Sequence, residues 1–316
     1  MRLLTGPAGR TATVVLAGAL VASCGGGDGG SSSASTTTTT GPGATTSTTA
    51  APGYGPAVLA GEVADPEVDE SSGLAASRRN PGLLWTHNDS GDEPRIFCLT
   101  AQAARCGTWT VAGAKARDWE DMAAGPGPAA GEPYLYLGDI GDNKGVLEGV
   151  VVYRVREPQA DAGGATATGA TERAEAIPLR YDDGPHDAEA LMVHPTTGDL
   201  YVITKALVGV GVYKAPPGTA VLTRIASFDL GVGHLVTGAD IAPDGRRVAV
   251  STYRSGYELT LPESESSFDA IWSQPPQPVD LGLRAQGEAV AYRLDGTGLF
   301  ASSEKAPARL FLTEQG

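Results

Sequence analysis

The sequence predicts an all-β fold, a β-propeller of five four-stranded blades, and three observations support this prediction. A short polar-then-apolar motif occurs five times between residues 55 and 316, at spacings of 48, 69, 50 and 49 residues. Each motif is followed by a turn rich in Gly, Pro and Asp and then by a second apolar run. Repeats of 40 to 50 residues with strand-like content are typical of propeller blades.

The five motifs are expected to form the inner strands. They are Glu70–Ala75, Asp118–Ala123, Asp187–Met192, Thr237–Ala242 and Gln286–Ala291. The second strands are expected at Leu83–Thr86, Tyr134–Leu137, Leu200–Ile203, Arg247–Val250 and Gly298–Ala301. These runs are β-branched, aromatic and nearly continuous, as strands buried on both faces should be.

The outer strands are less regular. Third strands are expected at Arg95–Cys98, Val150–Tyr153, Gly211–Lys214, Phe268–Trp272 and Arg309–Leu312, and fourth strands at Thr108–Val111, Ala174–Leu179, Leu222–Phe228 and Val279–Leu281. The last repeat lacks a fourth strand, which Ala57–Val63 can supply, and this closure would remove the exposed sheet edges. Residues Gln159–Thr171 are expected to be a polar loop, and a sixth, degenerate blade is the alternative.

The N-terminus predicts export and lipid anchoring. Arg2 and Arg10 flank an apolar stretch, Thr11–Val21, that is too short to span a bilayer. It ends in Leu20-Val21-Ala22-Ser23-Cys24, which looks like a lipobox and implies diacylglycerol on Cys24 and cleavage before it. The alternative is an ordinary secretory signal with Cys24 incidental.

Three segments follow from this: a lipoprotein signal peptide at 1–23, a linker at 24–52 and the propeller at 53–316. The linker is almost entirely Gly, Ser, Thr, Pro and Ala, so it is expected to be disordered, with a reach of about 30 Å. The expected location is extracytoplasmic, with the membrane contacted through the lipid alone. The formal net charge of −14 excludes nucleic acid as a partner through a basic face, and we expect a monomer.

The three cysteines support the same compartment. With Cys24 committed to lipid, Cys98 and Cys106 remain as a pair eight positions apart, across a predicted hairpin. In an oxidising compartment such a pair is expected to form a disulfide.

Polar side chains gather at one predicted rim. The start of each inner strand and the end of each second strand meet there, and three repeats have Glu at one register, with Ser72 and Ala239 in the other two. Carboxylates at this density repel one another unless a cation lies between them, and Ca²⁺ accepts six to eight oxygen ligands. The predicted metal ligands are Glu120, Glu189, Glu288, Asp89, Asp139 and Asp142. The alternatives are that the acidic residues serve solubility or bind backbone N–H groups between blades.

Further residues at this rim are predicted to bind a small anionic ligand or a surface protein: His87, Asn88, Asn143, His186, Asp187, Lys205, Arg254, Glu304 and Lys305. The sequence contains no Gly-x-Ser-x-Gly, His-Glu-x-x-His, Cys-x-x-Cys or P-loop motif, so serine-nucleophile and zincin chemistry lack support.

The repeated acidic-x-Glu start, the turn, the Leu/Tyr-rich strand and the acidic tip resemble calcium-associated secreted propellers of the phytase-like, esterase-like and SMP-30/gluconolactonase types. The resemblance covers residues from about 55 onward and matches Glu120, Glu189 and Glu288 to the repeated Glu. Those families have Glu-Gly where this chain has Glu-Ala or Glu-Asp, and they usually have six blades. The resemblance implies Ca²⁺ and hydrolysis of phosphate esters or lactones. Two hypotheses therefore stand: a binding propeller holding a cation, and a Ca²⁺-dependent hydrolase.

Overall fold

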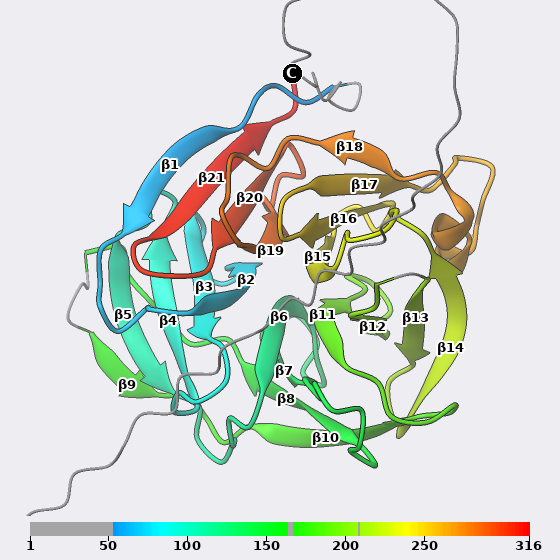
Figure 1. The fold of residues 1–316 in the computed structure, drawn as a ribbon. Coiled ribbons are helices and arrows are strands. Elements are labelled where there is room, and N and C mark those ends of the chain that lie inside the picture. The colour runs from blue at the N-terminus through cyan, green and yellow to red at the C-terminus, as the bar shows by residue number, and fades with distance from the viewer. Residues whose placement is uncertain (1–52, 164–166, 208) are drawn as a thin grey trace, which may run out of the picture. The chain divides into compact units, whose positions relative to one another are not determined.

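The computed structural model describes residues 53–163, 167–207 and 209–316, and Figure 1 shows them as sheets arranged around a central axis. We call the region between their innermost strands the channel. The strands form four hydrogen-bonded sheets, of four, eight, four and five strands. Within them, antiparallel sets of four strands follow one another along the chain, and a parallel pairing joins two of these sets into the eight-stranded sheet. In chain order these are β2 (Ser71–Ala76), β3 (Leu83–Asn88), β4 (Arg95–Thr100) and β5 (Arg105–Thr110); β6 (Trp119–Pro126), β7 (Pro133–Asp139), β8 (Val150–Arg156) and β10 (Glu175–Tyr181); β11 (Ala188–Val193), β12 (Leu200–Thr204), β13 (Val210–Ala215) and β14 (Val221–Phe228); β15 (Val236–Ile241), β16 (Arg247–Thr252), β17 (Gly256–Thr260) and β18 (Gln277–Val279); and β19 (Gly287–Tyr292), β20 (Gly298–Ser303), β21 (Ala308–Glu314) and β1 (Val58–Val63). The predicted all-β propeller is confirmed.

The inner strands β2, β6, β11, β15 and β19 line the channel. Each packs against the next, and β19 packs against β2, so the ring is closed (Figure 1). The N-terminal strand β1 pairs antiparallel with β21, from Val58 opposite Leu312 to Val63 opposite Ala308, as predicted. Every inner strand therefore begins at one end of the channel and ends at the other.

Two strand predictions were wrong. Residues Phe268–Ser273 form a 3₁₀ helix, η1, and the third strand of the fourth blade is β17. The apolar residues Phe268, Ile271 and Trp272 are spaced as on one face of a helix, which buries Ile271 and Trp272. The long polar loop after β8 contains β9 (Thr168–Ala170), which lies parallel to β5 at the edge of the first blade.

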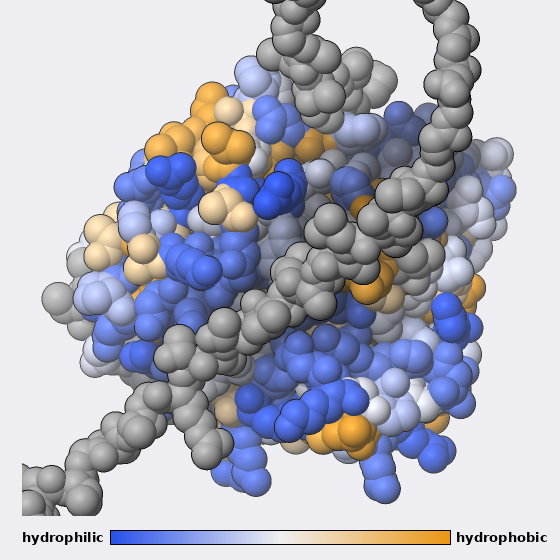
Figure 2. All heavy atoms as spheres, viewed as in Figure 1, coloured by the Kyte–Doolittle hydropathy of each residue, from blue (hydrophilic) through white to orange (hydrophobic). Residues whose placement is uncertain are grey.

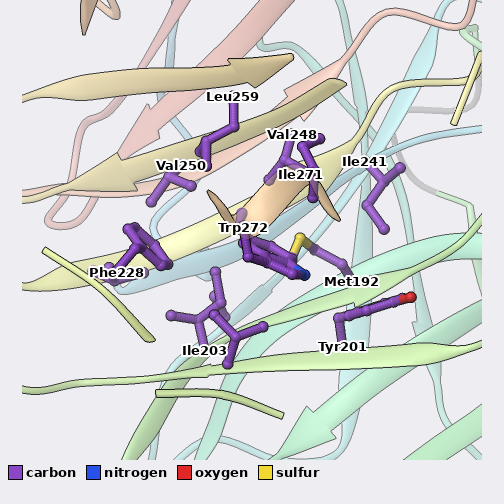
Figure 3. Packing of buried hydrophobic residues seen from close by; sticks show 14 of the residues in the cluster. Met192, Tyr201, Ile203, Phe228, Ile241, Val248, Val250, Leu259, Ile271 and Trp272 are labelled. Carbon is purple, nitrogen blue, oxygen red and sulfur yellow. The ribbon is translucent and has the colours of Figure 1, made fainter. Parts of the chain in front are cut away.

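The apolar core lies between neighbouring blades. Figure 3 shows Trp272 of η1 among Phe228, Ile203 and Met192, and the Trp272 ring stacks on Phe228 at a centroid distance of 5.9 Å. The predicted Cys98–Cys106 disulfide is confirmed; it joins β4 and β5 with a Cα–Cα distance of 5.0 Å. These contacts hold the outer strands in place, whereas the side chains that face the channel come from the inner strands.

The surface seen in Figure 2 is largely hydrophilic, with apolar side chains gathered over β1 and β21. Val58 and Leu59 of β1 are about half exposed there. Within the described ranges, no helix combines the length and apolar character needed to cross a bilayer. The predicted signal peptide, Cys24 and the linker to residue 52 lie outside those ranges.

Candidate metal centre at the channel mouth

A β-bulge recurs near the start of all five inner strands. In each strand the pairing skips one register step against the second strand, for example between Trp119 and Asp121 and between Ala188 and Ala190. The first residue inside each bulge is, in chain order, Ser72, Glu120, Glu189, Thr237 and Glu288. Bulges re-aim side chains and are frequent beside functional sites. The repeated glutamates thus share one structural position.

The fourth repeat corrects the predicted register. The bulge aligns Thr237, and not Ala239, with the three glutamates. Asp240, in the same predicted inner strand, lies three residues beyond Thr237 and borders a cavity of about 20 Å³ at the opposite end of the channel, beside Arg78 and Tyr292. Ser72 and Thr237 donate hydrogen bonds to the carbonyl oxygens of Glu120 and Glu288 in the following blades. The two hydroxyls therefore link adjacent inner strands.

Five carboxylates meet where the inner strands begin, and we call Asp89, Asp118, Glu120, Asp187 and Glu189 the acidic mouth. Asp89, Asp118 and Glu120 each place a carboxylate oxygen within 4.8 Å of the others, and so do Glu120, Asp187 and Glu189. Glu120 belongs to both trios, which we call the first and the second trio. Oxygen-only clusters of this kind suit hard divalent cations such as Ca²⁺.

Glu120 is buried with a relative exposure of only 4 %. Nevertheless, no N–H or O–H group among the described residues donates a hydrogen bond to its carboxylate, and no described Lys or Arg forms an ion pair with it. Burial raises the pKa of Glu120, and the nearby charges of Glu189 and Asp89 raise it further. A buried carboxylate without donors is unfavourable in its ionised form unless a cation compensates it.

Gly141 leaves the space beside these carboxylates open. A Cβ at this position would lie 2.2 Å from Glu120 Oε1 and 2.4 Å from Asp118 Oδ2. Both distances are shorter than any allowed contact, so every other residue at position 141 would displace the two carboxylates. The backbone N–H of Gly141 donates to the Asp118 carbonyl at 3.3 Å, which holds the glycine against the first trio.

The second trio already contacts a positive charge. Lys205 follows β12, its backbone N–H donates to the Asp187 carbonyl at 2.9 Å, and its Nζ forms an ion pair with Glu189. The same Nζ lies 5.4 Å from the centre of the Tyr253 ring. Burial disfavours the charged form of Lys205, but Glu189 outweighs it and raises the lysine pKa. Lys205 is therefore a fixed cation of the site.

The remaining predicted metal ligands lie near the acidic mouth but outside both trios. Asp139 accepts a hydrogen bond from the Asp118 backbone N–H at 2.9 Å, and Asp142 accepts one from Leu147 N–H at 2.7 Å. Glu288 is buried, and its pKa is raised to about 9 by burial and by the charges of Glu189 and Glu304. Asp139 thus orients a trio member, whereas Glu288 contributes negative charge from the fifth blade.

The other predicted ligand-binding residues differ in exposure: some are buried, some half-buried and some exposed. Asn88 is buried and donates to the Glu67 carbonyl at 2.8 Å, while the Nδ1–H of fully buried His87 donates to the Asn88 carbonyl at 2.8 Å. Half-buried His186 contacts Asp183 Oδ1 at 2.8 Å and the Tyr213 hydroxyl at 2.7 Å. Glu304, also predicted, is half-buried beside Glu288. Three residues are exposed: Asn143, Arg254 and Lys305.

Two charged residues were missed as site candidates by the sequence reasoning. Asp118 belongs to the first trio, and its place as the first residue of the predicted Asp118–Ala123 motif, at the predicted rim, was the available signal. Arg284 is buried and donates to Ser251 Oγ at 2.9 Å and to the Ser302 carbonyl at 3.3 Å, between the fourth and fifth blades. It lies in a link without repeat character, so no pattern could have identified it.

No protein-family model matches the chain, and the comparison with curated proteins finds no relative. Solved structures resemble it in fold. They include a luciferin-regenerating enzyme (11% identity, TM-score 0.44, covering 78% of this chain and 92% of that chain). A chain of a nidogen/laminin complex has 13% identity and a TM-score of 0.44, with 74% of this chain and 72% of that chain covered. The β-propeller domain of Cps50 (Swd1) from Myceliophteria thermophila has 10% identity and a TM-score of 0.43, covering 83% of this chain and all of that domain. In sum, the chain has the fold of a β-propeller.

Proposed function

We propose that this chain is a lipid-anchored binding propeller outside the cytoplasmic membrane, and that its acidic mouth holds a divalent cation, with Ca²⁺ the best match. The observation that carries the proposal is Glu120, which is buried, has no hydrogen-bond donor among the described residues, and belongs to both carboxylate trios. A cation between the trios would compensate this charge. Carboxylate oxygens from separate strands also suit the flexible coordination of Ca²⁺.

The proposed ligand of the cation-loaded site is a small anion or an anionic group on a surface protein. In each trio, one oxygen from each of the three carboxylates lies within 4.8 Å of the others, and three oxygens are fewer than the six to eight that Ca²⁺ accepts, so positions remain for water or a ligand oxygen. Exposed Arg254 and Lys305 follow second strands that end at the same rim. Arg117, with 41 % of its side chain exposed, donates to the carbonyl oxygens of Asp139 and Gly141. Basic groups around an acidic centre favour an anion that bridges the cation and the rim.

Thermal unfolding of residues 53–316 with and without Ca²⁺ tests the cation. At 100 times the dissociation constant, Ca²⁺ is expected to raise the free energy of unfolding by about 2.7 kcal/mol, or the Tm by about 5–10 °C for a domain of this size. Glu120→Gln should abolish the shift. Glu148→Gln is the matched control, because it removes the same charge from an exposed position. An unchanged Tm in wild-type protein, or a full shift in Glu120→Gln, would contradict the proposal.

Hydrolysis is the second candidate, because the open coordination positions could carry water as well as a ligand. In this case a cation held by the carboxylates of the acidic mouth would lower the pKa of a water molecule and polarise a phosphate ester or lactone. Release of nitrophenol from nitrophenyl phosphate and opening of a simple γ-lactone, each with Ca²⁺ and with chelator, distinguish the two functions. A rate that depends on Ca²⁺ and is lost in Glu120→Gln favours the enzyme; Ca²⁺ binding without turnover favours the binding propeller.

Lipid anchoring is tested separately in cells that process lipoproteins. The full-length chain should partition with membranes through Cys24, and Cys24→Ser should be released as a soluble propeller. Membrane association of Cys24→Ser equal to that of the natural chain would contradict the anchor without affecting the cation site.

A further inference from the structure

The five blades place different residues at one equivalent position of the rim, directly after the second strand. The register is fixed because Asn88, Asp139, Thr204, Thr252 and Ser303 each pair with the residue that precedes the bulge. The next residues are Asp89, Ile140, Lys205, Tyr253 and Glu304. The third blade thus carries a cation at the position where the first and fifth blades carry carboxylates.

This register brings Lys205 to the second trio. Its Nζ is paired with Glu189, whose side chain is only 6 % exposed, and 20 % of the lysine side chain is exposed. Tyr253, at the same register in the fourth blade, covers Nζ with its ring. Three contacts therefore hold Lys205 in place: the hydrogen bond from its backbone N–H to the Asp187 carbonyl, the ion pair of Nζ with Glu189, and the ring of Tyr253.

The first trio differs in this respect. Its members Asp89, Asp118 and Glu120 form no ion pair with any Lys, Arg or His that the structure describes. Asp89 and Asp118 are half-buried and Glu120 is buried, so a cation could reach them from the mouth. The two trios share Glu120 and have the same carboxylate chemistry, yet among the described residues only the second trio forms an ion pair with a protein cation.

On the basis of the proposed cation site, we propose that Lys205 acts as a built-in cation that occupies the second trio and restricts the propeller to one divalent ion, bound at the first trio. The ammonium occupies the space beside the Glu189 carboxylate, so a second divalent ion could bind the second trio only by displacing Lys205 from its ion pair. Lys205 thereby sets the stoichiometry of the site and keeps a second ion from the Glu189 side.

The test is the number of Ca²⁺ ions bound per chain, measured by isothermal titration calorimetry and by equilibrium dialysis. Wild-type protein and Lys205→Arg should bind one ion. Lys205→Met should bind two, because the second trio then has three carboxylates and no protein cation. Lys144→Met, at an exposed loop position, is the matched control and should bind one ion.

The outcomes separate this inference from the function on which it rests. No Ca²⁺ binding by wild-type protein would overturn the proposed function. One ion in wild-type protein and still one in Lys205→Met would overturn the role of Lys205 alone. If Lys205→Met does not fold, Lys205→Gln removes the charge but keeps a donor for Glu189, and two ions are again expected. Failure of both variants to fold even in Ca²⁺ would also overturn the inference, because the divalent ion would then be unable to replace the ammonium.

Discussion

Adjacent residues on β6 show two ways of burying a carboxylate. Asp121, inside the channel, is 1 % exposed and accepts hydrogen bonds from the backbone N–H groups of Met122, Leu191 and Ala239 at 2.8, 3.0 and 3.3 Å. Glu120, at the channel mouth, is buried almost as deeply and accepts none from the described residues. Burial by itself therefore does not separate a structural carboxylate from a binding one; the donors around it do.

Other buried carboxylates follow the pattern of Asp121. Glu157 accepts hydrogen bonds from Arg78 N–H, Arg79 N–H and the Trp85 indole at 3.1, 3.0 and 2.9 Å. Asp240 accepts bonds from Ile241 N–H and Tyr292 N–H, both at 2.8 Å. These groups join blades through backbone donors and need no ligand. Glu120 accepts no such hydrogen bond from the described residues, and this difference is the observation on which the proposed cation site rests.

The strongest test of this comparison is Asp121→Ala. The substitution removes the acceptor of two N–H groups from other blades, and each buried unpaired donor costs about 1–3 kcal/mol. We expect the free energy of unfolding to fall by about 3 kcal/mol, as measured by urea denaturation. Asp244→Ala, at an exposed turn, should change it by less than about 0.5 kcal/mol. A loss as small as that of the control would contradict a structural role for Asp121.

Gly141→Ala should reduce Ca²⁺ affinity at least tenfold, or about 1.4 kcal/mol. The new Cβ would collide with Glu120 Oε1 and Asp118 Oδ2 and push both carboxylates out of position. Titration calorimetry measures the affinity. Gly55→Ala is the control, since its Cβ would lie 3.7 Å from its nearest neighbour, and it should bind Ca²⁺ as wild-type protein does. Unchanged affinity in Gly141→Ala would place the ion elsewhere.

In the metal-free protein, Glu288 should make stability depend on pH. The folded-state pKa of Glu288 is raised to about 9, so the native state holds a proton that the unfolded state releases above its ordinary pKa of 4.5. Stability from this group is complete below about pH 4.5 and is lost as pH rises through about 9. In chelator, the Tm should fall between pH 5 and 9, and Glu288→Gln should flatten this slope. An equal slope in both proteins would exclude Glu288 as its source.

The smallest effect is expected for Glu120→Gln without metal. Because the pKa of Glu120 is raised by burial, a neutral amide resembles its protonated form, and the free energy of unfolding should change by less than about 1 kcal/mol. Urea denaturation in chelator measures this. A loss comparable with that of Asp121→Ala would show that Glu120 is held by donors, and the distinction between the two residues would fail.

Most of the architecture could be predicted because turns and apolar runs repeat at blade spacing. The closing strand and the rim where polar residues gather follow from the same repeat, whereas the disulfide was predicted from the number of cysteines and the hairpin between Cys98 and Cys106. The bulges could not be predicted. A bulge sets two residues of one strand opposite a single residue of the next strand, and this does not change the pattern of apolar and polar residues in the sequence. For the same reason the fourth repeat was aligned on Ala239, although the bulge selects Thr237.

Within the rim, sequence could not separate metal ligands from loop carboxylates. The carboxylates of Asp139 and Asp142 accept hydrogen bonds from backbone N–H groups, whereas that of Asp118 accepts none from the described residues. In the sequence, however, all three are simply acidic residues beside strand ends. The difference depends on which oxygen meets which donor across blades, and this is a property of three-dimensional packing. The pairing of Lys205 with Glu189 across a bulged strand is similarly invisible in the sequence.

The closing strand also decides which side of the molecule is accessible. Tyr54 bridges to Gln315, and Gln315 N–H donates to the Thr297 carbonyl in the turn after β19, so the chain enters and leaves the propeller at the rim opposite the acidic mouth. A support or a fusion partner joined directly to the propeller at Tyr54 or Gly316 would therefore lie nearer the far face than the acidic mouth. The mouth would stay sterically open toward the surroundings, which lets it receive ligands carried on objects much larger than the propeller itself.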